Sequence, residues 1–237
     1  MQGIVKKITS LQQEVAAIAT RVSRDPATIT IVAVGKGQPL EHVAVAVTAG
    51  IPDIGENYVQ ELRTKYQALR ELPIRWHFIG RLQTNKVKYL VPIVHLFHSL
   101  DRESLVHELD RQGGRYGRML DVLLQVNTSG EPTKAGVLPH NAHQLLSAVL
   151  TTKYLRPRGL MTLAGLEHSA DQVREEFRLL RTLRDELARD FGLENFTELS
   201  MGMSSDYTIA IEEGATIVRI GTRIFGERPT NQPTSSQ

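Results

Sequence analysis

A single lysine stands where a reactive amine is expected. Lys36 directly follows the apolar, β-branched run 29–35, and Gly37 and Pro39 end any strand at this point. Its ammonium group is therefore predicted to lie at the carboxyl end of a strand, where α/β proteins bind their ligands. A lysine that is partly desolvated has a lowered pKa and can attack a carbonyl carbon as a neutral amine. Taken alone, the position also suits an ordinary solvated loop lysine.

A second group of residues, near the other end of the sequence, is suited to hold an anion. Residues 215–220 predict a short buried strand, and Gly221-Thr222 directly after it offers backbone N–H groups and a hydroxyl. Ser200 and Ser204, in the preceding Leu-Ser-Met-Gly-Met-Ser segment, add two hydroxyls. In barrel enzymes the loops after strands 7 and 8 often bind phosphate. A lone Gly-Thr pair is also typical of a simple turn with a helix cap.

Two further polar residues belong to this candidate site. Arg219 interrupts the otherwise apolar strand before Gly221, and a buried guanidinium requires a partner because an unpaired buried charge is unfavourable. Asn57 follows the short predicted strand 53–55. Its side chain is suited to contact a cofactor ring, and it is also suited to cap the helix that follows.

Alternating strands and helices explain how these residues meet. Apolar, β-branched runs predict strands at 29–36, 53–55, 75–79, 94–99, 121–126, 158–163, 196–201 and 215–220. Helical spacing predicts helices at 4–22, 40–49, 59–70, 102–111, 138–150 and 171–189, with Asp101 capping the fourth and Gly113-Gly114 following it. Eight βα units favour an α/β fold, a single (β/α)8 TIM-type barrel with an extra N-terminal helix, over an open doubly wound sheet. We expect residues 1–228 to form the barrel and the polar tail 229–237 to be disordered.

Composition excludes several classes of protein. With 237 residues, a formal net charge of +2 and no basic run, the chain is not expected to bind nucleic acid. It has no cysteine, which excludes disulfides and thiolate metal sites. No apolar stretch reaches the roughly 20 residues that span a bilayer, and the first residues lack the apolar core of a signal peptide. The cytoplasm is the expected location.

Other residues with chemical potential are expected to be structural. His77, between Trp76 and Phe78, is predicted to be a hydrogen-bonded core histidine. His95 and His98 lie three apart in a predicted strand, so they are expected to point to opposite faces and to make a poor metal pair. Lys134, on the polar loop after the fifth strand, is expected to be solvated. We therefore predict no metal site.

On a barrel, all the candidate residues converge at the carboxyl ends of the strands. A cofactor with an aldehyde, a phosphate and a ring nitrogen would use the amine, the anion site and the arginine together, which indicates pyridoxal 5′-phosphate (PLP). The predicted contacts are Lys36 as the Schiff base, Asn57 at the ring, Arg219 at the pyridine nitrogen, and Ser200, Ser204, Gly221 and Thr222 at the phosphate.

The same segments carry a resemblance to a known family. The matching stretches are 55–61 (GENYVQE), 76–80 (WHFIG), 82–86 (LQTNK), 159–161 (GLM), 199–204 (LSMGMS), 218–222 (VRIGT) and 224–226 (IFG). In these motifs, which occur in the family's order from about residue 32 to 228, the sequence resembles the pyridoxal phosphate homeostasis proteins, which have the alanine-racemase-type barrel.

The chain departs from this family beside the lysine. The family usually reads Ser-Lys-Thr-Lys-Pro, and this chain reads Gly35-Lys36-Gly37-Gln38-Pro39. Two hydroxyls and a second cation are missing, so we expect cofactor affinity or the pKa of the lysine to differ from what is usual in the family.

The resemblance implies a PLP-binding protein of PLP homeostasis, with PLP as a Schiff base on Lys36. Its role would be to supply or buffer PLP and to balance amino acid and keto acid pools, with PLP-dependent apo-enzymes as recipients. We expect a monomer without catalytic residues. An arginine at the pyridine nitrogen keeps that nitrogen unprotonated and weakens the ring as an electron sink. Alanine racemases add a second domain with a second acid/base group, which we do not expect here.

Two alternatives remain open at this stage. One is a low-activity PLP-dependent enzyme, such as a racemase or lyase that acts on small amino acids. The other is a barrel that binds a different phosphorylated ligand, with Lys36 as a plain electrostatic contact.

Overall fold

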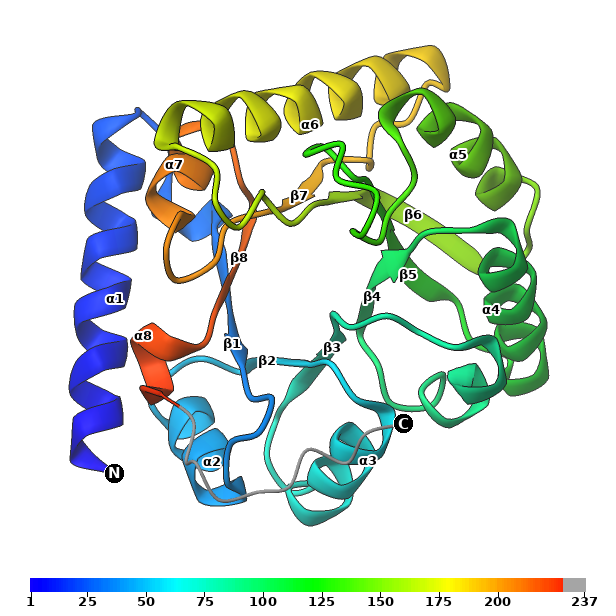
Figure 1. Cartoon of the computed structure of the whole chain (residues 1–237). Coiled ribbons are helices and arrows are strands. Elements are labelled where there is room, and N and C mark those ends of the chain that lie inside the picture. The colour runs from blue at the N-terminus through cyan, green and yellow to red at the C-terminus, as the bar shows by residue number, and fades with distance from the viewer. Residues whose placement is uncertain (228–237) are drawn as a thin grey trace.

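The computed structural model describes residues 1–227, in which eight parallel strands close into a barrel (Figure 1). The strands follow one another around the barrel in sequence order, and β8 pairs with β1 to close it. The strands are β1 (Thr30–Val34), β2 (Asp53–Glu56), β3 (Arg75–Phe78), β4 (Leu96–Leu100), β5 (Leu120–Gln125), β6 (Leu155–Met161), β7 (Glu198–Ser200) and β8 (Ile217–Ile220). The predicted (β/α)8 barrel is confirmed.

Helices surround the strands on the outside of the barrel (Figure 1). The α-helices are α1 (Gln2–Arg21), α2 (Leu40–Thr48), α3 (Val59–Ala68), α4 (Glu103–Tyr116), α5 (Ala142–Leu150), α6 (Ala170–Asp190), α7 (Tyr207–Glu212) and α8 (Thr222–Phe225). Short 3-10 helices are η1 (Pro26–Thr28), η2 (Thr84–Tyr89) and η3 (Pro139–Asn141). The sequence did not indicate η2 and α7, because each has six residues and shows no full period of apolar positions.

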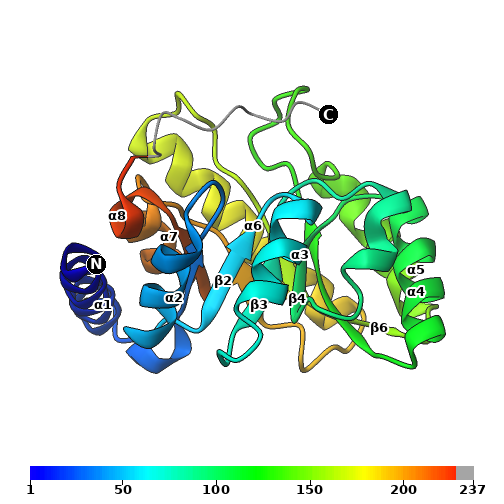
Figure 2. The ribbon, with the colours of Figure 1, turned by 90° about the horizontal axis from the view of Figure 1, so that it is seen from below.

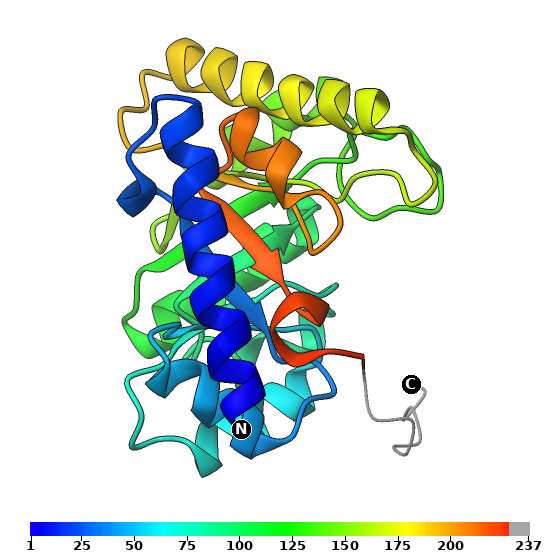
Figure 3. The same ribbon diagram turned by 90° about the vertical axis from the view of Figure 1, so that its left-hand side faces the viewer.

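The predicted N-terminal helix is present as α1 and lies against the barrel wall. Its apolar face, which includes Ile8, Leu11 and Val15, is buried, and the opposite face is exposed. Figure 3 shows α1 lying along α7 and α8, which come from the other end of the chain. Each of these side chains contributes about 1.5–3 kcal/mol when fully buried, so α1 stabilises the part of the wall where β8 meets β1.

One helix boundary differs from the prediction. Gly113 and Gly114 were expected to follow the fourth helix, but both lie inside α4, which ends at Gly117 with a φ of 60°. A Cβ added to Gly113 or Gly114 would lie 2.7 or 2.9 Å from side-chain atoms of Tyr154. The two glycines therefore let a tyrosine pack directly on the helix. Asp101 does not cap α4 with its side chain, which instead pairs with Arg102.

The barrel interior is divided between apolar and polar side chains. Val32, Leu96, Leu123, Met161 and Ile217 form one buried apolar cluster inside the ring of strands. Most of the remaining apolar core lies between the strands and the outer helices, as a parallel barrel requires.

Polar residues occupy other interior positions. His77 is buried and hydrogen-bonded, as predicted. The prediction that His95 and His98 point to opposite faces is wrong: both rings lie near His77, with ring centroids 5.6 and 5.1 Å away. The physical reason is that His95 precedes β4 and does not follow the alternation of the strand.

Loops after β5 and β6 rise above the carboxyl ends of the strands on one side of the barrel (Figure 2). Among residues 1–227, no helix combines the length and the apolar character needed to cross a bilayer. The predicted barrel limit at residue 228 and the predicted disorder of 229–237 lie outside the described residues.

Candidate functional site

Four neighbouring strands bring the predicted site residues to one side of the barrel rim, in the order β2–β1–β8–β7. Val34 pairs with Gly55, and Ala33 pairs with Ile220, so the segments after β2 and β8 flank the segment after β1. Ser200 pairs with Ile217 on the next strand. The loops that carry Lys36, Asn57, Ser204 and Gly221 are therefore adjacent.

Lys36 lies in a turn two residues beyond β1, rather than at the end of the strand itself. Gly37 has a φ of 71°, which a glycine adopts without strain and which turns the chain sharply after the lysine. The side chain of Lys36 is half-buried, and its Nζ lies 5.7 Å from the ring centre of Tyr58. This is the geometry of a cation–π contact between the lysine and the ring.

A cluster of three charged residues, of which Glu56 and Lys65 are buried and Glu61 is partly exposed, holds the backbone on both sides of Lys36. The Nζ of Lys65 donates to the carbonyl oxygen of Gly35 at 2.6 Å, and to carboxylate oxygens of Glu56 and Glu61 at 2.7 Å each. Glu61 Oε1 also accepts a hydrogen bond from the N–H of Gly37 at 2.7 Å. We call these three residues, Glu56, Glu61 and Lys65, the lysine clamp. It fixes the residue before and the residue after Lys36.

Within the lysine clamp, Glu56 is fully buried and electrostatically unusual. Burial raises its pKa to about 7, although the charges of Lys65 and Lys36 oppose the rise. Its second oxygen, Oε2, has no hydrogen-bond partner among the described residues. A carboxyl group that titrates near neutral pH therefore lies beneath the loop of Lys36.

The glycine at position 35 makes room for this carboxyl group. A Cβ added to Gly35 would lie 2.6 Å from Oε1 of Glu56, closer than real Cβ contacts. A serine at this position would therefore require the carboxyl group of Glu56 to move from the place that it has in this chain.

Asn57 follows β2 and lies at the rim beside Lys36. The Oδ1 atom of its side chain is buried and has no hydrogen-bond partner in the described part of the chain. The alternative prediction, a side-chain cap on the next helix, is wrong, since α3 begins after Tyr58 and has no side-chain cap. Gly80 packs on the backbone of Asn57 so closely that a Cβ would lie 2.2 Å from the Asn57 carbonyl oxygen. Asn57 is therefore held firmly and has an unused acceptor.

Arg219 lies inside the barrel on β8 and is 3% exposed. Its guanidinium donates to Ser200 Oγ at 2.6 Å and to the carbonyl oxygen of Thr162 at 2.7 Å. Burial lowers its pKa to about 10, and the charge of Asp206 partly opposes this effect. The sequence predicted that the buried guanidinium has a partner, and the structure shows two, a hydroxyl and a carbonyl oxygen.

Ser200 is fully buried and is hydrogen-bonded to side chains within the barrel. Its hydroxyl contacts the guanidinium of Arg219 and Nδ1 of His98, 2.9 Å away. The prediction that Ser200 holds a phosphate stays a prediction, and the structure places its oxygen between two other side chains.

The remaining candidates for anion binding lie on two adjacent loops. Among residues 1–227, the hydroxyls of Ser204 and Thr222 make no hydrogen bond, and Thr222 is exposed. Asp206 holds the Ser204 loop by accepting from the N–H of Met203 at 2.6 Å. Gly221 is the residue before α8 and lies against Val34 of β1. In residues 200–206 and 221–222 these loops offer hydroxyls and N–H groups, and their one acidic side chain is Asp206, which accepts hydrogen bonds from the N–H of Met203 and the hydroxyl of Ser205.

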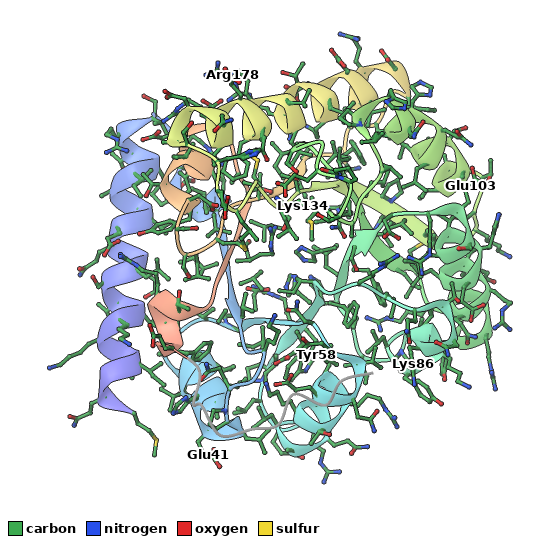
Figure 4. All side chains as sticks on the ribbon, viewed as in Figure 1. Glu41, Tyr58, Lys86, Glu103, Lys134 and Arg178 are labelled. Carbon is green, nitrogen blue, oxygen red and sulfur yellow. The ribbon has the colours of Figure 1, made fainter. Side chains whose placement is uncertain are left out.

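Lys134 and Tyr58 lie on opposite sides of the barrel opening (Figure 4). The ammonium group of Lys134 donates to the carbonyl oxygen of Ala164 at 2.6 Å and lies 3.0 Å from the carboxylate of Glu131. The prediction of a solvated lysine is wrong, because its side chain is largely buried and joins the loops after β5 and β6.

Sequence reasoning missed the lysine clamp and His98. Glu61 and Lys65 stand four residues apart on α3, the spacing of a helical ion pair, and this signal was present in the sequence. No pattern indicated that this face of α3 turns toward the loop of Lys36. The role of His98 depends on side chains from β3 and β7, so local sequence contained no signal for it.

Comparison with known proteins places the chain among relatives of similar length. Residues 7–229 match the family described as alanine racemase, N-terminal domain. A protein of Aquifex aeolicus named pyridoxal phosphate homeostasis protein is 43% identical over 223 residues, which are 94% of this chain and 97% of the relative. The Escherichia coli protein of the same name is 37% identical over 235 residues, 96% of this chain and 98% of the relative.

Solved structures show the same arrangement of strands and helices. PipY of Synechococcus elongatus, solved with PLP bound, superposes with a TM-score of 0.84 at 36% identity and covers 94% of this chain and 100% of its own. Alanine racemase from Corynebacterium glutamicum superposes with a TM-score of 0.70 at 15% identity, covering 98% of this chain and 62% of its own. The second likeness shows the fold alone.

Proposed function

Because this chain belongs to the family of the pyridoxal phosphate homeostasis proteins, which shares the alanine racemase N-terminal domain, we propose that it binds PLP and acts as a carrier and buffer of PLP. The relative PipY has been solved with PLP bound, and it covers nearly the whole of this chain. In this role the protein would affect the balance of amino acids and keto acids and would pass PLP to apo-enzymes.

The observation that supports the proposal is that the loops of Lys36, Ser204 and Gly221 follow adjacent strands, and that the buried guanidinium of Arg219 lies on one of these strands. We propose Lys36 as the Schiff-base lysine, held by the lysine clamp. Ser204, Gly221 and Thr222 would bind the phosphate. Ser200, which the sequence also assigned to the phosphate, would instead hold the guanidinium of Arg219, which its hydroxyl contacts. Asn57, whose buried Oδ1 lacks a partner, would contact the ring.

The residues present fit PLP better than a plain phosphorylated ligand. A phosphate alone needs only the loops of Ser204 and Thr222, and it would leave unexplained the two contacts that hold the backbone around Lys36. When bound, PLP supplies an aldehyde for an amine and a ring that can accept electrons. Arg219 at the ring nitrogen disfavours protonation there and so weakens the ring as an electron sink. We therefore propose binding without efficient turnover.

Location and assembly state are proposed on the sequence alone. We propose a cytoplasmic monomer that binds neither nucleic acid nor membranes. Light scattering at two protein concentrations measures the assembly state, and a mass that doubles with concentration would contradict the monomer.

The test of PLP binding is an absorption titration of the purified protein with PLP. A protonated Schiff base absorbs near ~420 nm, a general property of PLP bound to lysine. We expect this band in the wild type and in Lys88→Ala, which removes an exposed lysine, and we expect its loss in Lys36→Ala. Borohydride should fix the cofactor to the peptide that contains Lys36. A wild type that stays colourless contradicts the proposal.

The anion site is tested separately from the lysine. Thr222→Val and Ser204→Ala each remove one hydroxyl and should weaken PLP binding by about ten- to a hundredfold, the range of one hydrogen bond to a charged group. Addition of small amino acids then separates a carrier from an enzyme, since only an enzyme converts them in amounts that exceed the protein.

A further inference from the structure

A chain of five polar side chains crosses the interior of the barrel. It begins at Asp53 on β2 and passes through His77 on β3, His98 on β4 and Ser200 on β7 to Arg219 on β8. The successive hydrogen-bond distances are 2.9 Å from Asp53 to His77, 2.9 Å from His77 to His98, 2.9 Å from His98 to Ser200 and 2.6 Å from Ser200 to Arg219. All five residues are at most 4% exposed. We call this chain the barrel relay.

The two ends of the barrel relay determine which way its hydrogen bonds point. A guanidinium only donates and an ionised carboxylate only accepts. If each imidazole carries a single proton, which is the state that the first test below examines, His77 donates through Nε2 to Asp53 and accepts at Nδ1. His98 then donates through Nε2 to His77 and accepts at Nδ1 from the hydroxyl of Ser200. The oxygen of Ser200 is left to accept from Arg219.

The cation at the upper end needs this support. Among the described residues, the guanidinium of Arg219 has no carboxylate in ion-pair contact, and its acceptors are the hydroxyl of Ser200 and the carbonyl of Thr162. The charge of Asp206 acts on it from beyond ion-pair distance and only partly offsets its burial. An isolated buried charge is costly unless oriented dipoles or an opposite charge compensate it. In the barrel relay every dipole has its negative side toward Arg219. Hydrogen bonds in such chains polarise one another and strengthen.

The lower end has the opposite charge and lies at the amino-terminal mouth of the barrel. Asp53 and His77 line a cavity of about 410 Å³ there, together with His95 and Glu198. The carboxylate of Asp53 also pairs with Arg75, whose side chain is half-exposed and shares its charge with water. His77 is 2% exposed, so of the two contacts of Asp53, the one with His77 is shielded from solvent and the one with Arg75 is not.

We propose that Asp53 is the remote counter-anion of Arg219, and that His77, His98 and Ser200 transmit its effect as positioning residues for the cofactor end of the barrel. This inference rests on the proposed function, in which Arg219 faces the ring of PLP. It assigns a role to side chains at the mouth opposite the cofactor site. None of these three residues needs to touch the cofactor.

The first test needs no cofactor. Long-range ¹H–¹⁵N NMR spectra of the wild-type protein report which nitrogen of each imidazole carries the proton, and His77→Gln and His98→Gln identify the signals. We expect the Nε2–H form for both His77 and His98. A proton on Nδ1 of His98 means that His98 donates to Ser200. The hydrogen bonds of the barrel relay would then point the other way at this step, and the proposal would be overturned.

The second test asks whether the lower end affects the upper end. Asp53→Asn removes the negative charge of the barrel relay, and Glu198→Gln makes the same change at another carboxylate of the same cavity, outside the relay. We expect the apparent Kd for PLP to rise by about tenfold in Asp53→Asn, the effect of weakening one charged hydrogen bond. Glu198→Gln should stay within about twofold of the wild type. Equal affinities in the two variants overturn the proposal.

A third variant interrupts the middle of the chain. His98→Phe keeps an aromatic ring but leaves the hydroxyl of Ser200 without its acceptor, and His95→Phe changes a neighbouring histidine that belongs to no hydrogen bond of the relay. We expect weaker PLP binding and a shifted absorption band in His98→Phe only. If the wild type binds no PLP at all, the proposed function fails, and the NMR test still decides whether the relay exists.

Discussion

The Nζ of Lys65, on α3, lies 2.6 Å from the carbonyl oxygen of Gly35, the residue directly before Lys36. A lysine in the core thus positions a lysine at the rim. Lys65 is 4% exposed and contacts two carboxylates, so its own charge is compensated. The amine that we propose to react and the amine that positions it are therefore distinct groups.

Lys65→Met should destabilise the protein and weaken PLP binding. It leaves two carboxylates without their cation, and breaking a buried ion pair costs about 3–5 kcal/mol. Chemical denaturation measures the loss, with Lys88→Met as the control because that lysine is exposed. Adding Glu56→Gln to Lys65→Met should restore part of the stability. A double variant whose loss equals the sum of the single losses would show that the two groups do not interact.

Gly35→Ser should lower stability although it introduces the residue that is usual in the family. The new Cβ would meet Glu56 Oε1 at 2.6 Å, and overpacking of this kind costs about 1–3 kcal/mol. Thermal unfolding measures the change. Gly3→Ser, with no atom within 4 Å of its Cβ, should have only a small effect. Equal melting temperatures for Gly35→Ser and the wild type would mean that Glu56 moves without cost.

The main effect that we expect of Gly80→Ala is weaker binding of PLP. Its Cβ would lie 2.2 Å from the backbone oxygen of Asn57, so the loop of Asn57 must move. We expect a rise of about tenfold in the apparent Kd from the PLP titration, the effect of losing one good contact. Asn57→Ala should show a similar rise, and it should add little to Gly80→Ala when the two are combined. Full additivity would contradict a shared cause.

Acid should remove the stability that Asp53 contributes. Burial alone would raise its pKa, but hydrogen bonds from Arg75 and His77 lower it to about 2, below the value of an unfolded chain. A group with a lowered pKa stabilises the fold above its unfolded value, and this contribution disappears as the pH falls through the folded value. We expect a loss of about 2 kcal/mol between pH ~4 and ~2.

The comparison for this prediction is Asp53→Asn, in which the acid-dependent contribution of this residue is absent. Its stability curve should be flatter over that pH range than the curve of the wild type. Parallel curves would show that Asp53 titrates normally in the folded protein.

The barrel and the position of Lys36 could be read from the sequence because both depend on local patterns. Strands of a closed parallel barrel are buried on both sides, so they stand out as short apolar runs between turns, as 30–34 and 217–220 do. Residues that follow such runs must lie at one end of the barrel. The same reasoning placed Asn57, Arg219 and Gly221 near Lys36.

Contacts made inside and beneath the barrel could not be predicted in this way. Glu56 comes from β2 and Lys65 from α3, and which face of α3 is buried depends on how the helix lies against the strands. The pairing of His77 with His98 depends on the register between β3 and β4. The next pair of strands, β4 and β5, has an irregular register, which apolar patterns do not reveal. The periodicity of apolar residues does not indicate which polar side chains contact one another.

The closure of the barrel by β8 against β1 has a consequence for the order of folding. Lys36 precedes Arg219 and Gly221 in the chain and therefore leaves the ribosome before them. α1 packs against α7 and α8, so it makes these contacts only after both of these later helices have been synthesised (Figure 3). Contacts between distant parts of a chain form slowly, because a long loop must close first. A nascent chain that lacks β8 and α8 would therefore have Lys36 but not Arg219, Gly221 or Thr222, and we expect PLP to be retained only after β8 has closed the barrel.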